Sequence, residues 1–166
     1  MKCDALLIGG SAGSLEVLLK ILPDFAETLS FPIIIVLHRK SRKNSMLTDL
    51  LQSKTKLPVK ELQEKEKILP GIIYIAPPDY HLLIENDRTF SLDASEKINF
   101  SRPSIDVTFE SAAEVYNENL FALLLSGANR EGTVGLKKIK ENDENAIVQK
   151  TETAEEGYMP KNDVEK

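Results

Sequence analysis

The chain has 166 residues, with 21 basic and 26 acidic side chains, a net charge of −5, 42% hydrophobic residues, one Cys and two His. This length fits one domain, which we expect to span residues 1–166. The negative net charge argues against a nucleic-acid surface. One Cys cannot form an internal disulfide, and two His with one Cys make a poor metal cage.

Nothing in the sequence predicts insertion into a membrane. No apolar run approaches the ~18 residues of a membrane span, and Asp4 stands where a signal peptide would have its apolar core. We therefore expect a cytoplasmic protein whose Cys3 is reduced and is an inert core thiol.

Apolar residues recur along the chain with the spacing of strands and helices in alternation, punctuated by Gly and Pro. In chain order, we predict a strand over 5–8, a helix over 15–22, a strand over 33–37, a short helix near 45–51, strands over 59–62 and 72–76, a hairpin of 81–85 and 89–93, a helix over 105–116, a strand over 121–125, a helix around 134–139 and a strand over 146–148. This alternation predicts a three-layer α/β fold. Its centre is a Rossmann-like, doubly wound, mostly parallel sheet, accompanied by a small antiparallel hairpin. Residues 150–166 are charged and predicted to be weakly structured.

Ligands of an open parallel sheet bind beyond the carboxyl ends of its strands, so the residues that follow the predicted strands are the candidates for a site. Ser11 follows the first strand within the sequence GGSAG, residues 9–13. This G-x-S-x-G pattern is typical of a tight turn that presents a serine oxygen beside the free amides of a helix N-terminus. Taken alone, it fits better with a turn that only links strand to helix, or that holds an anion.

His38 directly follows the predicted strand over 33–37, one βαβ unit from Ser11. From there it can reach the hydroxyl of Ser11 and act as its base, although the basic residues that follow also fit a solvated loop. His81 opens the predicted hairpin and fits a structural role better. Glu131, beyond the strand over 121–125, can orient an imidazole or merely favour a helix N-terminus electrostatically. The order Ser11, His38, Glu131 keeps all three at strand ends.

Several segments match, in order, the motifs of one known family. The sequence has IGGSAG at 8–13 for I-G-A-S-T-G-G, LH at 37–38 for Q-H, PGIIYIAPPDYHL at 70–82 for P-G-x-x-Y-x-A-P-x-D-x-H-L, RPSID at 102–106 for R-P-S-V-D, and LSGANREG at 125–132 for L-T-G-M-G-x-D-G. Gln149 and then Met159-Pro160 match its closing motifs. The chain thus resembles the catalytic domain of CheB, the glutamate methylesterase of chemotaxis receptors, over nearly its whole length.

The resemblance implies a serine hydrolase. Ser11 would be the nucleophile, His38 the general base and Glu131 the acid that orients His38, with backbone amides near Ala12 and Ala128 stabilising the oxyanion. The family removes methyl esters from γ-glutamyl groups on chemoreceptor helices, and some members also deamidate glutamine. Methylated chemoreceptor helices or related signalling proteins would be its partners. The family needs no metal or organic cofactor, and the resemblance implies no particular oligomeric state.

The sequence departs from the family pattern at the expected site. Glu131 replaces Asp, and Ala12 replaces a Thr whose hydroxyl the family aims at the oxyanion. Loss of one such donor slows turnover by roughly 10²–10³ if nothing substitutes. Ala128 replaces Met but keeps its backbone N–H. These departures favour, as the alternative, a catalytically weak or inactive CheB-like binding module in signalling; an esterase for small molecules is a third hypothesis.

The ends of the chain also differ from the family. Many members carry an amino-terminal receiver domain, whereas this chain begins one strand before Ser11, so phosphorylation control within the chain is not expected. The family continues with a helix and a strand after the segment that matches Met159-Pro160. We therefore expect a single CheB-type methylesterase domain over 1–166, with a carboxyl end that is truncated relative to the family.

Overall fold

The computed structural model describes residues 2–11, 14–38, 45–98, 102–125, 132–141 and 145–149. The helices and strands are β1 (Ala5–Gly10), α1 (Ser14–Ile21), η1 (Leu22–Asp24), β2 (Ile33–Leu37), α2 (Ser45–Gln52), β3 (Val59–Glu61), β4 (Ile73–Ile75), β5 (His81–Ile84), β6 (Phe90–Asp93), α3 (Ile105–Tyr116), η2 (Asn117–Asn119), β7 (Leu120–Leu124), α4 (Thr133–Glu141) and β8 (Asn145–Val148), where η marks a 3₁₀ turn.

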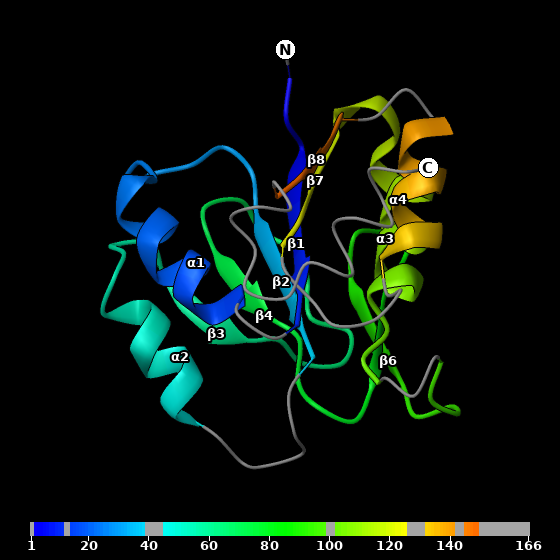
Figure 1. Ribbon diagram of the computed structural model, residues 1–166, viewed down its shortest axis with the longest axis horizontal. Coiled ribbons are helices and arrows are strands. Elements are labelled where there is room, and N and C mark those ends of the chain that lie inside the picture. Colours follow the sequence, from blue (N-terminus) through cyan, green and yellow to red (C-terminus); the bar gives the residue numbers. More distant parts are fainter. Residues whose placement is uncertain are drawn as a thin grey trace.

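The main sheet has six strands in the order β3-β4-β2-β1-β7-β8, and every neighbouring pair is parallel. Strands β5 and β6 form a separate antiparallel pair. Helices α1 and α2 lie on one side of the main sheet, and α3 and α4 lie on the other (Figure 1). The predicted three-layer, doubly wound fold with a small hairpin is confirmed.

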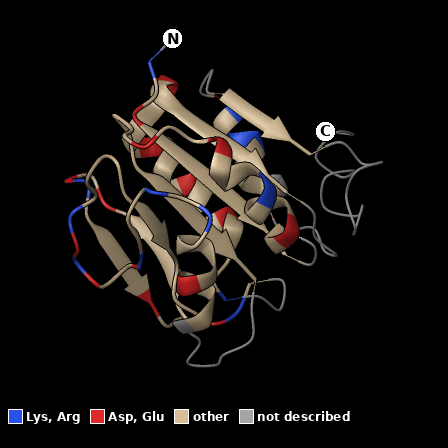
Figure 2. Ribbon diagram, turned by 90° about the vertical axis from the view of Figure 1, so that its left-hand side faces the viewer, with Lys and Arg blue, Asp and Glu red and all other residues tan. Residues whose placement is uncertain are grey.

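The core consists of two apolar clusters, one on each face of the main sheet. Successive side chains of a strand point to opposite faces, so in β1 Leu7 joins Phe109 of α3, whereas Ile8 joins Leu18 of α1. Every residue of β2 is buried, as its continuous apolar run predicted. Strands β1, β2 and β7 contain no charged residue, and charged residues gather on the helices and connecting loops (Figure 2).

Some details differ from the sequence prediction. Strand β7 begins and ends one residue earlier than predicted, and β3 and β4 are shorter. Val134, which helped to predict α4, is 58% exposed and therefore lies off the buried face of that helix. Cys3 is half-buried rather than in the core, and burial raises the pKa of its thiol, which keeps the thiol protonated. Residues 150–166, predicted to be weakly structured, lie outside the described residues.

His81 is a structural residue, as the sequence suggested. Its side chain is 1% exposed, its Nδ1 accepts a hydrogen bond from the backbone N–H of Ser104 at 3.1 Å, and its Nε2 contacts the carbonyl oxygen of Glu96 at 2.8 Å. Since Nδ1 accepts, the proton of the neutral ring sits on Nε2 and is donated to Glu96. His81 thereby joins the hairpin to the start of α3 and to the loop before it.

We expect His81→Ala to lower the free energy of unfolding by about 2–4 kcal/mol, because it removes a buried side chain and leaves the buried N–H of Ser104 without this partner. His81→Asn should lose less, since its Oδ1 can occupy the place of Nδ1 and accept from Ser104. Urea unfolding measures both, with Tyr80→Ala as the control at the neighbouring, 42% exposed position. Equal midpoints for His81→Ala and the wild type would contradict the structural role.

Tyr116 closes the other end of α3. Its ring is 3% exposed and lies under the guanidinium of Arg88, with Cζ 4.8 Å from the ring centroid, and Arg88 also contacts Asp4 at 3.7 Å. These contacts attach the turn of the hairpin to the residue just before β1. Burial raises the pKa of the Tyr116 hydroxyl to about 12, against an ordinary value of 10.0.

This pKa predicts a loss of stability at alkaline pH. Between about pH 10 and pH 12 the unfolded chain releases the Tyr116 proton while the folded chain keeps it, so the free energy of unfolding falls as pH rises through this range. Tyr116→Phe should make that decline less steep. Denaturant unfolding between pH 9 and pH 11 checks this, with Tyr80→Phe as a control at an exposed tyrosine. A slope unchanged by Tyr116→Phe would contradict the prediction.

Candidate active site

Ser11 and His38 follow two neighbouring strands at the same edge of the sheet. In the register of β1 and β2, Gly10 pairs with Leu37, so the final residues of the two strands are level. The backbone N–H of His38 then donates to the carbonyl oxygen of Gly10 at 3.1 Å. Both side chains are half-buried, and they leave the strands at adjacent points on the carboxyl edge.

The described residues that precede the segment 126–131 lie on the other side of β1. Gly9 pairs with Leu124 of β7, and the N–H of Leu125 donates to the carbonyl oxygen of Gly9 at 2.8 Å. The described chain resumes at Gly132, which lies against Leu124 of β7. Three residues predicted for the site, Glu131, Ala12 and Ala128, lie outside the described residues.

Close packing explains why the two positions before Ser11, Gly9 and Gly10, are occupied by glycine. A Cβ on Gly9 would lie 2.7 Å from Cγ2 of Ile105 and 3.1 Å from Cζ of Phe109, so a side chain there would push α3 away from the sheet. A Cβ on Gly10 would collide with the side chain of Ser14 and lie 3.2 Å from Cβ of Leu125. The two glycines thus allow α1, α3 and the residue after β7 to approach the end of β1, next to the candidate nucleophile.

Gly132, the residue before α4, packs closely against β7. Its φ is +95°, a conformation that side-chain-bearing residues rarely adopt, and a Cβ there would lie 2.7 Å from Cδ1 of Leu124. Its carbonyl oxygen accepts from the N–H of Leu136 at 2.8 Å, which begins the hydrogen bonding of α4. Gly132 therefore brings the chain back against the end of β7 before α4 starts.

Asp106 is a residue to which the sequence analysis assigned no role. Its carboxylate is buried, with the residue 5% exposed, and Oδ1 accepts a hydrogen bond from the backbone N–H of Gly135 at 2.7 Å. This contact joins the first turn of α3 to the first turn of α4. Its position in the RPSID segment was visible in the sequence, but its partner, a backbone N–H, was not.

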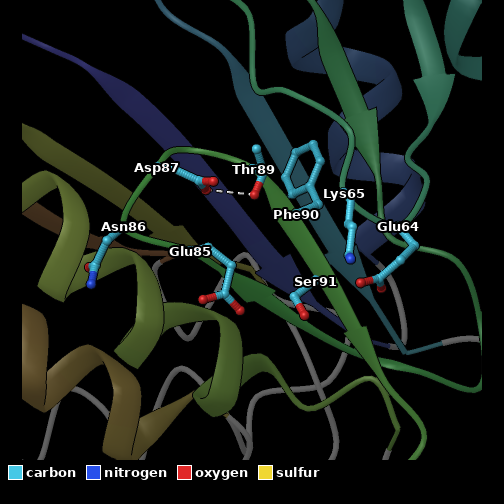
Figure 3. A pocket seen from close by; sticks show the side chains of 8 residues that line it. All are labelled: Glu64, Lys65, Glu85, Asn86, Asp87, Thr89, Phe90 and Ser91. Carbon is cyan, nitrogen blue, oxygen red and sulfur yellow. Dashed lines mark hydrogen bonds between the residues drawn. The ribbon is translucent and has the colours of Figure 1, made fainter.

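A concavity of about 600 Å³ lies elsewhere in the described part of the chain (Figure 3). It is lined by Glu64, Lys65, Glu85, Asn86, Asp87, Thr89, Phe90 and Ser91. The hairpin turn that supplies part of this lining contacts Asp4 through Arg88, so it lies toward the amino end of β1, away from Ser11. The lining contains hydroxyls but no imidazole or thiol, and the Thr89 hydroxyl already donates to Asp87 at 2.7 Å. It therefore lacks the imidazole that a Ser-His pair requires.

Two further findings concern metal binding and membrane insertion. The described residues contain no group of three His, Cys, Asp or Glu side chains that could hold a metal ion. Among the helices that the structure describes, none has the length and apolarity needed to cross a membrane.

Comparison with known proteins identifies the family. Residues 6–166 match the family model described as CheB methylesterase. A Leptospira interrogans protein named "Putative protein-glutamate methylesterase/protein-glutamine glutaminase" is 47% identical over 165 residues, which cover 99% of this chain and 86% of that protein. The protein-glutamate methylesterase/protein-glutamine glutaminase of Thermotoga maritima is 36% identical over 96% of this chain and 47% of its own length.

A solved structure agrees with the sequence relatives. The crystal structure of the Thermotoga maritima CheB methylesterase catalytic domain superposes with a TM-score of 0.93 at 35% identity, covering 99% of this chain and 89% of that one. The fold, the match along the whole sequence and the placement of Ser11 and His38 lead to one assignment. The chain belongs to the CheB methylesterase family.

Proposed function

We propose that this protein is a protein-glutamate methylesterase, a carboxylic ester hydrolase that restores glutamate from γ-glutamyl methyl esters. Its relatives over nearly the whole chain bear that enzyme's name, together with protein-glutamine glutaminase. The observation that carries the assignment to residues is the level register of β1 and β2, after which Ser11 and His38 emerge next to each other. We propose Ser11 as the nucleophile, His38 as the general base and Glu131 as the acid that orients His38.

The reaction follows from these roles. The oxygen of Ser11 attacks the ester carbonyl carbon while His38 removes the hydroxyl proton. Backbone N–H groups near Ala12 and Ala128 stabilise the oxyanion of the tetrahedral intermediate. The intermediate collapses, and the methoxide leaves as methanol with the proton that His38 returns. Water, activated by His38, then hydrolyses the acyl-enzyme to give a glutamate carboxylate and free Ser11.

The departures from the family pattern suggested an inactive binding module as the alternative, and the similarity to named enzymes does not favour it. Glu131 retains a carboxylate at the position of the family's Asp, and Ser-His-Glu triads are known on hydrolase folds. Ala12 lacks the hydroxyl that the family aims at the oxyanion, but Ala12 and Ala128 both retain the backbone N–H groups that we propose as oxyanion donors. The Leptospira protein, similar over 99% of this chain, carries the enzyme's name.

We propose methylated chemoreceptor helices as the substrate, a cytoplasmic location, and one CheB-type domain over residues 1–166. The location follows from the resemblance to a signalling enzyme and from the absence of a signal-peptide pattern at the amino-terminal residues. The single domain is supported by the match over residues 6–166 and by one continuous sheet that includes strands from both halves of the chain.

The nucleophile is tested with a serine-directed phosphonate probe and with methanol release from methylated receptor. We expect the probe to label Ser11 in the folded protein, and Ser11→Ala to lower kcat by about 10³–10⁶-fold with its unfolding midpoint close to wild type. Ser53→Ala, at an exposed serine after α2, is the matched control and should keep full activity. Unchanged methanol release by Ser11→Ala would overturn the proposed role.

The substrate class is tested by competition. Methylated receptor and a simple aryl methyl ester are offered at equal concentration, and we expect kcat/KM to be at least about tenfold higher for the receptor, because contacts away from the reacting bond contribute transition-state binding. Rapid hydrolysis of the aryl ester without methanol release from the receptor would instead identify an esterase for small molecules.

A further inference from the structure

Arg102 lies close to the point where α3 meets the end of β1. Cγ2 of Ile105, the first residue of α3, lies 2.7 Å from the place that a Cβ on Gly9 would occupy. Arg102 precedes Ile105 by three residues, a reach of at most roughly 10 Å. Ser11 is two residues beyond Gly9, directly after β1. Arg102 therefore lies near the same edge of the main sheet as the proposed nucleophile.

The open end of the hairpin reaches this edge as well. The hairpin turn contacts Asp4, the residue before β1, through Arg88 at 3.7 Å, so the turn lies toward the amino end of β1. Strand β6 runs away from that turn and ends at Asp93, which is paired with His81. The segment 94–98, which follows β6, therefore lies toward the carboxyl edge of the main sheet.

Two carbonyl groups of this segment hold one end of the Arg102 guanidinium. Nη1 of Arg102 donates to the carbonyl oxygens of Ala94 and Ser95 at 3.1 and 3.0 Å. A guanidinium is planar and has five N–H groups, of which two are on Nη1. The contacts with Ala94 and Ser95 therefore use both N–H groups of Nη1 and fix the direction of the planar group.

The other edge of the guanidinium, formed by Nε and Nη2, has no acceptor in the described part of the chain. Nε is buried without a hydrogen-bond partner among the described residues, and none of these residues accepts from Nη2. A buried polar group without a partner is rare in folded proteins, and it is most costly when the group is charged. Arg102 as a whole is only half-buried, so a ligand can approach its guanidinium from solvent.

The charge of Arg102 is not neutralised by an acid within the described residues either. None of the ion pairs among these residues includes Arg102. The acid next to its carbonyl partners, Asp93, is occupied by Ser95, whose N–H donates to Oδ1 and whose hydroxyl donates to Oδ2, each at 3.0 Å. Arg88, by contrast, contacts Asp4. Arg102 is thus a fixed cation whose free edge has the two parallel N–H groups that bind a carboxylate through both oxygens.

We propose that Arg102 is a specificity-determining residue, which binds an acidic side chain of the protein segment that carries the methyl ester. This inference rests on the proposed function and names a further feature of its substrate. Nε and Nη2 donate to the two carboxylate oxygens, while Nη1 keeps its contacts with Ala94 and Ser95. In a helical substrate, residues three, four or seven positions apart lie on one face, so one face presents the ester to Ser11 and the acid to Arg102.

The substrate preference is tested with pairs of helical peptides, each with one γ-glutamyl methyl ester. One member of a pair has Glu and the other has Gln, at a position three, four or seven residues before or after the ester. For at least one position, we expect wild-type kcat/KM for methanol release to be about tenfold higher with Glu, because a hydrogen bond to a charged group away from the reacting bond contributes to transition-state binding. Equal kcat/KM within every pair would overturn the inference.

The role of Arg102 is tested with the preferred pair of peptides. We expect Arg102→Gln to reduce the ratio of kcat/KM between the Glu and Gln peptides from about ten to about one. A merely structural role of Arg102 would lower both values by the same factor and preserve the ratio, and that result would overturn the inference. Lys97→Gln is the matched control, because it removes an exposed cation from the segment 94–98 and should leave the ratio unchanged.

A second variant keeps the test decisive if Arg102→Gln folds poorly, as its unfolding midpoint would show. Arg102→Lys keeps the positive charge and a donor for the carbonyl groups but lacks the planar fork, so we expect a ratio of about three or less. A ratio of about ten in Arg102→Lys would overturn the proposed contact through Nε and Nη2.

The same peptides distinguish failure of this inference from failure of the proposed function. If the wild type releases methanol from every peptide but does not discriminate within any pair, the role of Arg102 is wrong and the esterase activity stands. If it releases methanol from no peptide and from no methylated receptor, and Ser11 is not labelled by the phosphonate probe, the proposed function itself fails.

Discussion

The level pairing of β1 with both of its neighbours is the constraint on which the site depends. Gly10 is opposite Leu37 and Gly9 is opposite Leu124, and backbone hydrogen bonds continue the ladder one residue further on each side. Because parallel strands end at the same edge, chain segments far apart in the sequence emerge together there. A slip of one residue in the pairing of β1 with β2 would turn the side chains after one strand to the opposite face of the sheet and separate the proposed nucleophile from its base.

Glycine makes this convergence possible at several points. Because Gly9 and Gly10 have no side chains, α3, α1 and the residue after β7 can pack against the end of β1. Gly132 and Gly135 likewise allow α4 to pack against β7 and α3. The side-chain hydrogen bonds of His81, Ser104 and Asp106 then fix the helix whose approach the glycines permit. The site is therefore held by backbones in close contact and a few buried polar groups, which is a rigid arrangement suited to positioning reactive groups.

The sequence predicted the strands and helices well where a physical signal was local. The β-branched run of β2 and the spacing of apolar residues in α3 identified those elements with their observed bounds, and the separate structural role of His81 was confirmed. Val134 fits the spacing of apolar residues in α4 but is exposed. The spacing of one apolar residue does not show whether another element of the fold covers it.

Asp106 shows why part of the site was beyond sequence reasoning. An acid in the first turn of a helix is ordinarily explained by the helix dipole, and nothing local indicates burial. Its partner is a backbone N–H on another helix, and residue types alone do not show which backbone N–H a side chain will contact. The positions of Ser11 and His38 could be predicted because they depend only on strand ends, whereas the roles of Ser11, His38 and Glu131 stay predictions.

The pairing of β1 with β7 has a consequence for synthesis of the protein. Ala5 is hydrogen-bonded in register with Leu120, so one edge of the central strand lacks its neighbour until most of the polypeptide has left the ribosome. During that interval the nascent chain presents an open, strongly apolar strand edge, which is the kind of surface that chaperones bind and that aggregates when left unprotected.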